Sequence, residues 1–139
     1  MTDRTSSVSP SAEHLAAETG RACIDAAQLV AFFAARFLTS PSARRTDDCI
    51  EWCILTTRVL GACADVLREH PAPHREAVLA LARAGSIAAG GCATAMSEFT
   101  DAASARNARE ACQHAAATLA EYVAHHEGAV ESPALATAS

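Results

Sequence analysis

The chain of 139 residues lacks lysine, long apolar runs and all but a few aromatic side chains. No apolar stretch reaches the roughly 18 residues that a transmembrane helix needs, so the sequence predicts no membrane contact. Aromatic residues make up 4% of the chain, which argues against a β-sandwich or a β-barrel. The 11 basic residues are dispersed arginines and the formal charge is -5, so the basic surface that nucleic-acid binding requires is missing.

Several chemical motifs are also absent. The sequence has no C-x2-C pair, which argues against zinc ribbons, thioredoxin-type redox motifs and ferredoxin-type clusters. It has no E-x-x-H pair of the di-iron type, and no nucleophile elbow, P-loop or dinucleotide fingerprint. The sequence therefore predicts no particular reaction and leans toward a protein that is not an enzyme.

Six cysteines are the most unusual feature that the sequence does contain. The first ten residues are polar and have no apolar segment of the kind that a secretory signal carries, so we expect a cytoplasmic location. Cysteines in a reducing compartment are poor disulfide candidates. The remaining interpretations are metal thiolates, redox thiols or small buried core residues.

The helices can be predicted from composition and from polar breaks in the chain. Alanine accounts for 35 of the 139 residues, and the two proline-bearing breaks, at 39–42 and 70–73, stop helices. A third break lies at 101–104, so we expect helices over 12–38, 47–69, 74–100 and 105–126. The predicted fold is all-α, an antiparallel up-down-up-down four-helix bundle over 12–127. Segments 1–11 and 128–139, rich in Ser, Thr, Pro and Ala, are predicted to be disordered tails.

The cysteines all fall on the apolar stripes of these predicted helices, so we expect their sulfurs to point inward. Residues can be matched in height across the bundle by counting from each connection at about 1.5 Å per residue. This count brings four thiols and one thioether to the end formed by the first and third connections, and it sets a second thiol pair apart. The first group is Cys49, Cys53, Cys92, Cys112 and Met96, and the second is Cys23 and Cys63.

Inward-facing sulfur ligands predict a soft metal ion. Cys49 and Cys53 are one helical turn apart, so their two sulfurs can hold one ion between them. Cu(I) accepts two or three thiolate or thioether ligands, whereas Zn(II) prefers four ligands in a tetrahedron. We therefore predict a Cu(I) site with Cys49, Cys53, Cys92 and Cys112 as ligands, Met96 as an auxiliary ligand, and Cys63 and Cys23 as further candidates.

The sequence resembles the bacterial four-helix-bundle copper storage proteins over about residues 20 to 124. The resemblance is carried by Cys23-Ile-Asp-Ala-Ala27, Asp48-Cys49-Ile-Glu-Trp-Cys53, Gly61-Ala-Cys63-Ala-Asp65, Gly91-Cys92-Ala-Thr-Ala-Met96 and Ala108-Arg-Glu-Ala-Cys112. Members of that family line the bundle with repeated C-x3-C turns and hold many Cu(I) ions. Here only the turn from Cys49 to Cys53 is intact, because Ala27 and Met96 stand where Cys23 and Cys92 would have partners. The resemblance therefore implies copper binding at low capacity.

Two other functions fit the same residues. In the first, the thinned core forms a small-molecule pocket or a catalytic site, for example in secondary metabolism, and polar groups on the predicted helices supply the chemistry. The polar candidates are Thr56, Thr57, Asp65 and Glu98. In the second, the chain is a helical interaction module that binds no metal. The partner is thus a metal ion or a small molecule, and exposed aromatics at Phe32, Phe33 or Trp52 would favour a homo-oligomer.

Five histidines map to the opposite end of the predicted bundle from the four thiols. Protonated histidine suits a helix C-terminus, so ordinary solvated helix ends explain them adequately. The sequence assigns no role to this set, which comprises His14, His70, His74, His125 and His126.

Overall fold

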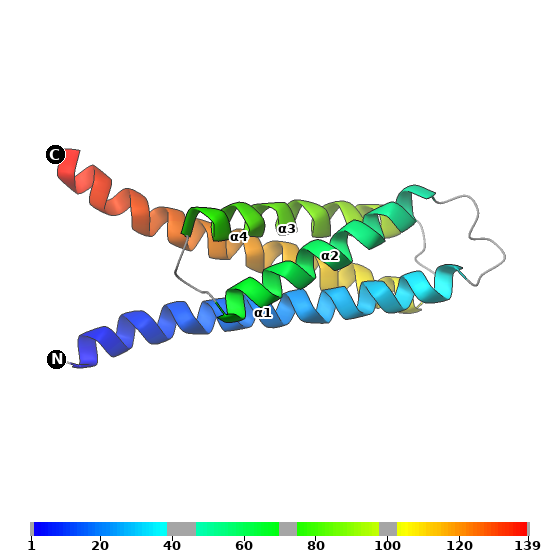
Figure 1. Cartoon of the computed structure of the whole chain (residues 1–139), viewed down its shortest axis with the longest axis horizontal. Coiled ribbons are helices and arrows are strands. Elements are labelled where there is room, and N and C mark those ends of the chain that lie inside the picture. Colours follow the sequence, from blue (N-terminus) through cyan, green and yellow to red (C-terminus); the bar gives the residue numbers. More distant parts are fainter. Residues whose placement is uncertain (1, 39–46, 70–74, 98–102, 139) are drawn as a thin grey trace.

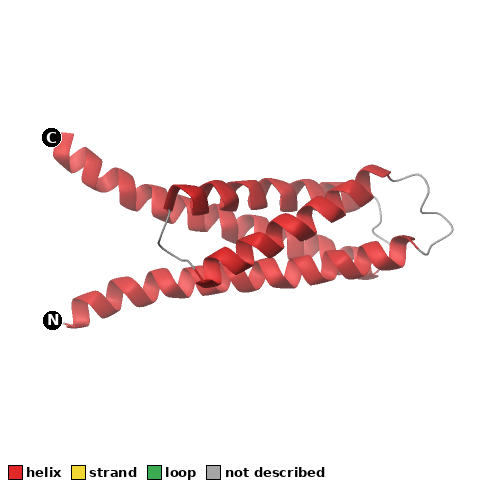
Figure 2. Cartoon of the chain, viewed as in Figure 1, coloured by secondary structure: helices red, strands yellow, loops and turns green. Residues whose placement is uncertain are grey.

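The computed structural model describes residues 2–38, 47–69, 75–97 and 103–138, with side chains described over 13–38, 48–69, 76–97 and 103–127. Four helices account for all of these residues except Ser97: α1 (Thr2–Leu38), α2 (Asp47–Glu69), α3 (Arg75–Met96) and α4 (Ala103–Ala138). Figure 2 shows no strand in the part of the chain that is drawn in colour. The predicted all-α class is confirmed.

The four helices pack in a closed ring. Each helix packs mainly against two neighbours: α1 lies against α2 and α4, and α3 lies against the same two helices. Successive helices run in opposite directions, and the N-terminal end of α1 and the C-terminal end of α4 lie at the same end of the bundle (Figure 1). The predicted up-down-up-down bundle is therefore also confirmed.

The helix bounds agree with the sequence in the middle of the chain and differ at both ends. The bounds of α2 are those predicted, and α3 ends four residues before the predicted position 100. Helix α1 begins at Thr2 and α4 continues to Ala138, so both helices extend into segments where we predicted disordered tails. A segment rich in Ser, Thr, Pro and Ala is expected to bury little surface. A helix that is already formed can still continue through such a segment, because adding a residue to an existing helix is easier than starting a new one.

The core is built from small side chains around a few large ones. Leu60, Leu119, Val30 and Tyr122 are almost completely buried, and each such aliphatic side chain contributes roughly 1.5–3 kcal/mol of burial free energy. Alanine is the commonest of the other buried residues, which lets the helices approach closely. At Gly85 of α3, a Cβ atom would lie 2.8 Å from the Cys63 sulfur, so only glycine fits this position without a shift.

Helix α3 is more apolar than the lack of long apolar stretches in the sequence indicated. Residues Glu76–Met96 have a mean hydropathy of 1.3, which together with their length would suffice to cross a membrane. In the bundle, 44% of this apolar stretch is buried against the other helices. A core helix meets the same criterion, because alanine and glycine raise the mean hydropathy without forming an uninterrupted run of large apolar residues. The absence of membrane contact thus remains a prediction.

Of the three aromatics expected at the surface, only one is largely exposed. Phe32 is 53% exposed, and the Arg36 guanidinium lies 5.6 Å from the centre of its ring. Phe33 is buried and stacks on Phe37 with ring centres 5.5 Å apart, so the expectation that it is exposed is wrong. Trp52 is half-buried and packs on the core. The aromatic argument for self-association therefore reduces to Phe32.

Candidate metal centre

All six cysteines are reduced and buried in the bundle interior. Their exposed fractions range from 0% to 3%, so no sulfur faces solvent. This burial follows from the helical period, because each cysteine lies on the inward stripe of its helix. Four of the six form one connected group: Cys49, Cys53, Cys92 and Cys112.

The four grouped thiols form a line across three helices. Cys49 and Cys53 are hydrogen-bonded along α2, one turn apart. The Cys53 thiol also bonds the Cys92 sulfur on α3, and Cys92 in turn bonds Cys112 on α4. We call these four residues the thiol line. The height count brought these same four residues together, so the structure agrees with the sequence on their proximity.

Hydrogen bonding distributes the protons unevenly along the thiol line. Bonds to Cys49 and Cys92, together with burial, raise the pKa of the Cys53 thiol above its usual 9.0. The bond to Cys92 raises the pKa of Cys112 in the same way. Cys92 accepts hydrogen bonds from Cys112 and from Cys53, and these donors, with the nearby Thr56 hydroxyl, lower its pKa against the opposing effect of burial. Cys92 is therefore the sulfur in the line best prepared to act as a thiolate ligand.

Cys23 and Cys63 form a second thiol pair between α1 and α2. The hydrogen bond between them raises the pKa of Cys23 and lowers that of Cys63. The Cys63 sulfur also lies 3.4 Å from the Leu81 carbonyl oxygen, to which its thiol donates. Cys63 follows Cys53 by ten residues on α2, about 15 Å along the helix axis, so the pair is separate from the thiol line.

Met96 is fully buried on α3, one turn beyond Cys92. Residues four apart on a helix share a face, so the thioether lies on the same side of α3 as the Cys92 sulfur. Among the described residues, no three His, Cys, Asp or Glu side chains cluster in the way that a single multi-ligand ion requires. The sulfurs instead meet in pairs, which suits two-coordinate binding of a soft ion better than tetrahedral zinc.

Three histidines of the predicted histidine-rich end lie within the described residues, and they contact side chains other than cysteine. His14 on α1 is exposed and pairs with Glu18 at 3.6 Å. On α4, the ring centres of His125 and His126 are 5.3 Å apart, and His126 packs against Tyr122 at 4.4 Å. Two further histidines of the predicted histidine-rich end fall outside the described residues: His70 and His74.

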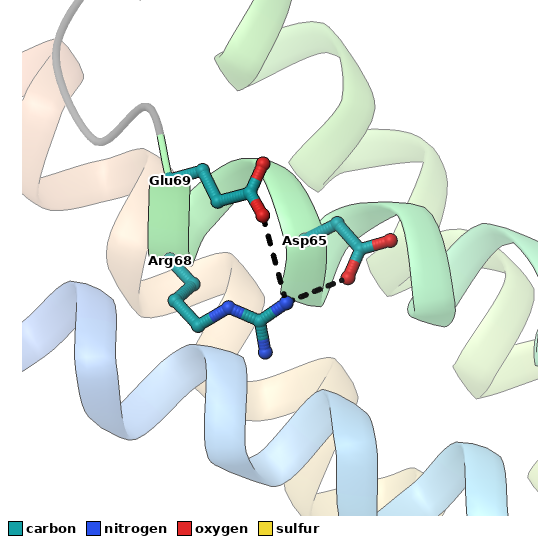
Figure 3. Close-up of polar contacts among 3 residues, drawn as sticks. All are labelled: Asp65, Arg68 and Glu69. Carbon is teal, nitrogen blue, oxygen red and sulfur yellow. Dashed lines mark hydrogen bonds and ion pairs between the residues drawn. The ribbon is translucent and has the colours of Figure 1, made fainter.

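Among the candidate acid–base residues that the structure describes, Thr56 is the one that reaches the thiol line. Its buried hydroxyl donates to the Ala88 carbonyl oxygen at 2.9 Å and also lies within hydrogen-bonding reach of Cys92. Asp65 instead forms a surface ion pair with Arg68 at 3.2 Å, and Arg68 also contacts Glu69 at 3.8 Å (Figure 3). Thr57 is half-buried, and Glu98 falls outside the described residues. These polar groups form no catalytic cluster in the described part of the chain.

A cavity of about 650 Å³ lies along the seam between α1 and α2. Its floor is small and apolar, with Ala16, Gly20 and Ala64, and Arg21 and Arg68 are among its charged lining residues. None of the six cysteines lines it, so it lies on the outer side of the seam. The alternative function, a small-molecule pocket in the thinned core, predicted a cavity in the interior of the bundle, which is a different location.

Comparison with known proteins gave a structural match but no sequence match. No family model matches the chain, and no curated protein matches its sequence. The fold is similar to that of a cytosolic copper storage protein from Streptomyces lividans, solved with five coppers, at a TM-score of 0.79 and 21% sequence identity. The match covers 83% of this chain and 97% of the other. The chain therefore shares its four-helix-bundle fold, over nearly the whole of the bundle, with that copper storage protein.

Proposed function

We propose that this chain is a low-capacity relative of the cytosolic copper storage proteins and binds a small number of Cu(I) ions through its thiol line. The observation that carries the proposal is the contact between Cys53 and Cys92, which joins the Cys49–Cys53 turn to Cys112 on a third helix. Each contact between neighbouring sulfurs offers one two-coordinate position to a soft ion.

The surroundings of the thiol line favour Cu(I) over harder ions. All of its proposed ligands are sulfur, and water, which would supply oxygen ligands, is kept out because the four cysteines are at most 3% exposed. Met96 adds a neutral sulfur next to Cys92, which suits the same ion. Each thiol that becomes a ligand loses its proton, so binding releases protons and weakens as the pH falls.

The number of sulfurs limits how much copper the chain can hold. The chain has six cysteines, and only Cys49 and Cys53 form a complete C-x3-C turn. Ala27 and Ala108 occupy inward or half-inward positions where further thiols would extend a copper core. We therefore infer binding of a few ions, centred on the thiol line, with the Cys23–Cys63 pair as a secondary position.

The experiment that tests this proposal compares copper content after expression in copper-supplemented medium. We expect the wild-type chain to purify with copper and the Cys49→Ala/Cys53→Ala double variant to lose most of it. A Cys23→Ala/Cys63→Ala double variant serves as the matched control and should retain copper on the thiol line. Equal copper in the wild type and in the Cys49/Cys53 variant would show that the metal is bound elsewhere.

A further inference from the structure

Trp52 stands directly beside the thiol line, on the flank of α2 that faces α3. It precedes Cys53 in the chain, so its side chain points about 100° around the helix from that sulfur. It is half-buried and packs against the core. One face of the indole is thus in contact with the bundle, and the rest borders solvent.

Gly91 on α3 receives the indole. A Cβ atom at this position would lie closer than 3.0 Å to three carbon atoms of the six-membered ring of Trp52: Cε3, Cζ3 and Cη2. Real Cβ contacts essentially never become this short, so only glycine leaves room for the ring. Gly91 precedes Cys92, just as Trp52 precedes Cys53. The indole therefore crosses the α2–α3 seam at the level where the Cys53 and Cys92 sulfurs meet.

The seam between α2 and α3 is also closed one helical turn further along α2, at Thr56. Thr56 follows Trp52 by four residues, so the two lie on nearly the same side of α2. Its hydroxyl donates to the Ala88 carbonyl oxygen of α3 at 2.9 Å, and its exposed fraction is 0%. Inside this layer, Cys53 and Cys92 are 1% and 0% exposed. Trp52 is thus the partly exposed member of the layer that separates the central thiol contact from water.

We propose that Trp52, seated on Gly91, is a cover that sets the rate at which Cu(I), competing copper ligands and thiol-directed reagents reach the Cys53–Cys92 contact. The copper part of this inference rests on the proposed function, whereas the thiol-shielding part stands on the packing alone. A cover acts on entry and exit equally, so its removal speeds both while leaving the equilibrium affinity unchanged. A residue that merely stabilised the ligand geometry would change the affinity instead.

The test uses the full chain, loaded anaerobically with Cu(I), and a water-soluble aromatic diimine chelator that forms a coloured Cu(I) complex. We expect Trp52→Ala to speed both copper release and copper uptake roughly tenfold, as local opening of a packed seam becomes easier when its largest side chain is removed. Trp52→Phe retains a smaller ring and should give an intermediate rate. Gly91→Ala should reproduce the Trp52→Ala rates, because its new Cβ displaces the indole without altering any sulfur.

The adjacent glycine supplies the matched control. A Cβ at Gly90 meets no atom within 4 Å, so Gly90→Ala should exchange copper at the wild-type rate. Trp52 is the only tryptophan, so its emission should shift to longer wavelength in Gly91→Ala and stay unchanged in Gly90→Ala. Unchanged emission in Gly91→Ala would contradict the contact itself.

Thiol labelling of the copper-free chain separates the two parts of the inference. A small alkylating reagent should modify Cys53 and Cys92 faster in Trp52→Ala and Gly91→Ala than in the wild type. If the wild type bound no copper but this acceleration were observed, the proposed function would fail and the cover would stand. Wild-type labelling and exchange rates in both variants, or a loss of affinity that matches the faster release, would overturn the cover.

Discussion

The Cys53 thiol of α2 and the Cys92 sulfur of α3 are hydrogen-bonded in the interior of the bundle, at 1% and 0% exposure. This contact connects two ligand candidates on α2 with one on α4 through a single sulfur on α3. It requires that α2 and α3 be in register to within about one turn, because neighbouring thiols meet only when their heights match. The connectivity of the thiol line therefore depends on the packing of α2 against α3.

Single cysteine substitutions should separate ligands from packing residues. We expect Cys53→Ala to weaken Cu(I) binding by more than the roughly 10- to 100-fold that loss of a supporting residue costs, because Cys53 contacts two other thiols. Cys49→Ala should also abolish tight binding, since it destroys the complete turn. Cys23→Ala should retain binding and cost on the order of 1 kcal/mol of stability. Chelator competition and thermal midpoints measure the two effects, and loss of binding in Cys23→Ala with retention in Cys49→Ala would refute the assignment.

The buried thiols predict a loss of stability at alkaline pH. Cys53, Cys112 and Cys23 have pKa values above the usual 9.0 in the folded chain, so their contribution is fully present below pH 9.0. Above that pH the unfolded thiols ionise while the folded ones retain their protons, and stability falls by about 1.4 kcal/mol per pH unit for each retained proton.

The thermal midpoint of the copper-free, reduced chain should therefore decrease between pH 9 and pH 10.5. The Cys23→Ala/Cys63→Ala variant is the control: it lacks one thiol with a raised pKa, and its midpoint should fall less steeply. Cys92 and Cys63, whose pKa values are lowered, oppose this fall only until their unfolded thiols have ionised, and the three thiols with raised pKa values outnumber them, so the sign is not reversed. A midpoint that rises over this interval would contradict the hydrogen-bonding pattern.

Two glycines on the bundle should respond in opposite ways to alanine. Gly85→Ala introduces a Cβ 2.8 Å from the Cys63 sulfur and 3.0 Å from a Leu119 methyl carbon, so we expect a loss of about 1–3 kcal/mol from overpacking. Gly61→Ala meets no atom within 4 Å and should stabilise α2 by roughly 0.5–1 kcal/mol through helix propensity. Urea unfolding of both variants measures the difference, and equal effects would mean that α3 does not approach Cys63 as described.

Thr56 should contribute to stability through its inter-helix hydrogen bond. Thr56→Val keeps the shape but removes the donor to the Ala88 carbonyl oxygen, leaving that buried acceptor without this partner. The expected loss is about 1–2 kcal/mol, and Thr56→Ser should recover part of it because it restores the hydroxyl. If Thr56→Val unfolded at the same urea concentration as the wild type, the bond would contribute nothing to the α2–α3 contact.

The sequence predicted the placement of the cysteines because that placement depends on regular quantities. The helical period puts Cys53 and Cys63 on the inward stripe of α2, and the rise per residue sets Cys92 level with position 52. The helical period and the rise per residue are the same in any antiparallel bundle with short connections. Metal binding by these residues is a separate matter, which their proximity supports and only a metal titration tests.

What the sequence did not predict depends on the particular distance and rotation between two helices. Nothing in the spacing of Trp52 and Gly91 indicates that one packs on the other, because the contact requires α2 and α3 to approach closely at that height. Phe33 was expected at the surface and is buried beside Phe37, since helical rotation places it on the edge of the inward stripe of α1. The start of α1 and the end of α4 are helical where we predicted disordered tails, and the reason is different. Composition indicates how much a segment packs, not which backbone conformation it adopts.

The most direct test of the account is an anaerobic Cu(I) titration of the reduced chain against a competing chelator. We expect tight, saturable binding of a few ions, no more than the six cysteines. We also expect the affinity to fall as the pH is lowered, because protons compete for the ligand sulfurs. No competition with the chelator at any protein concentration would contradict the copper assignment, and loading above six ions would contradict the low-capacity site on the thiol line.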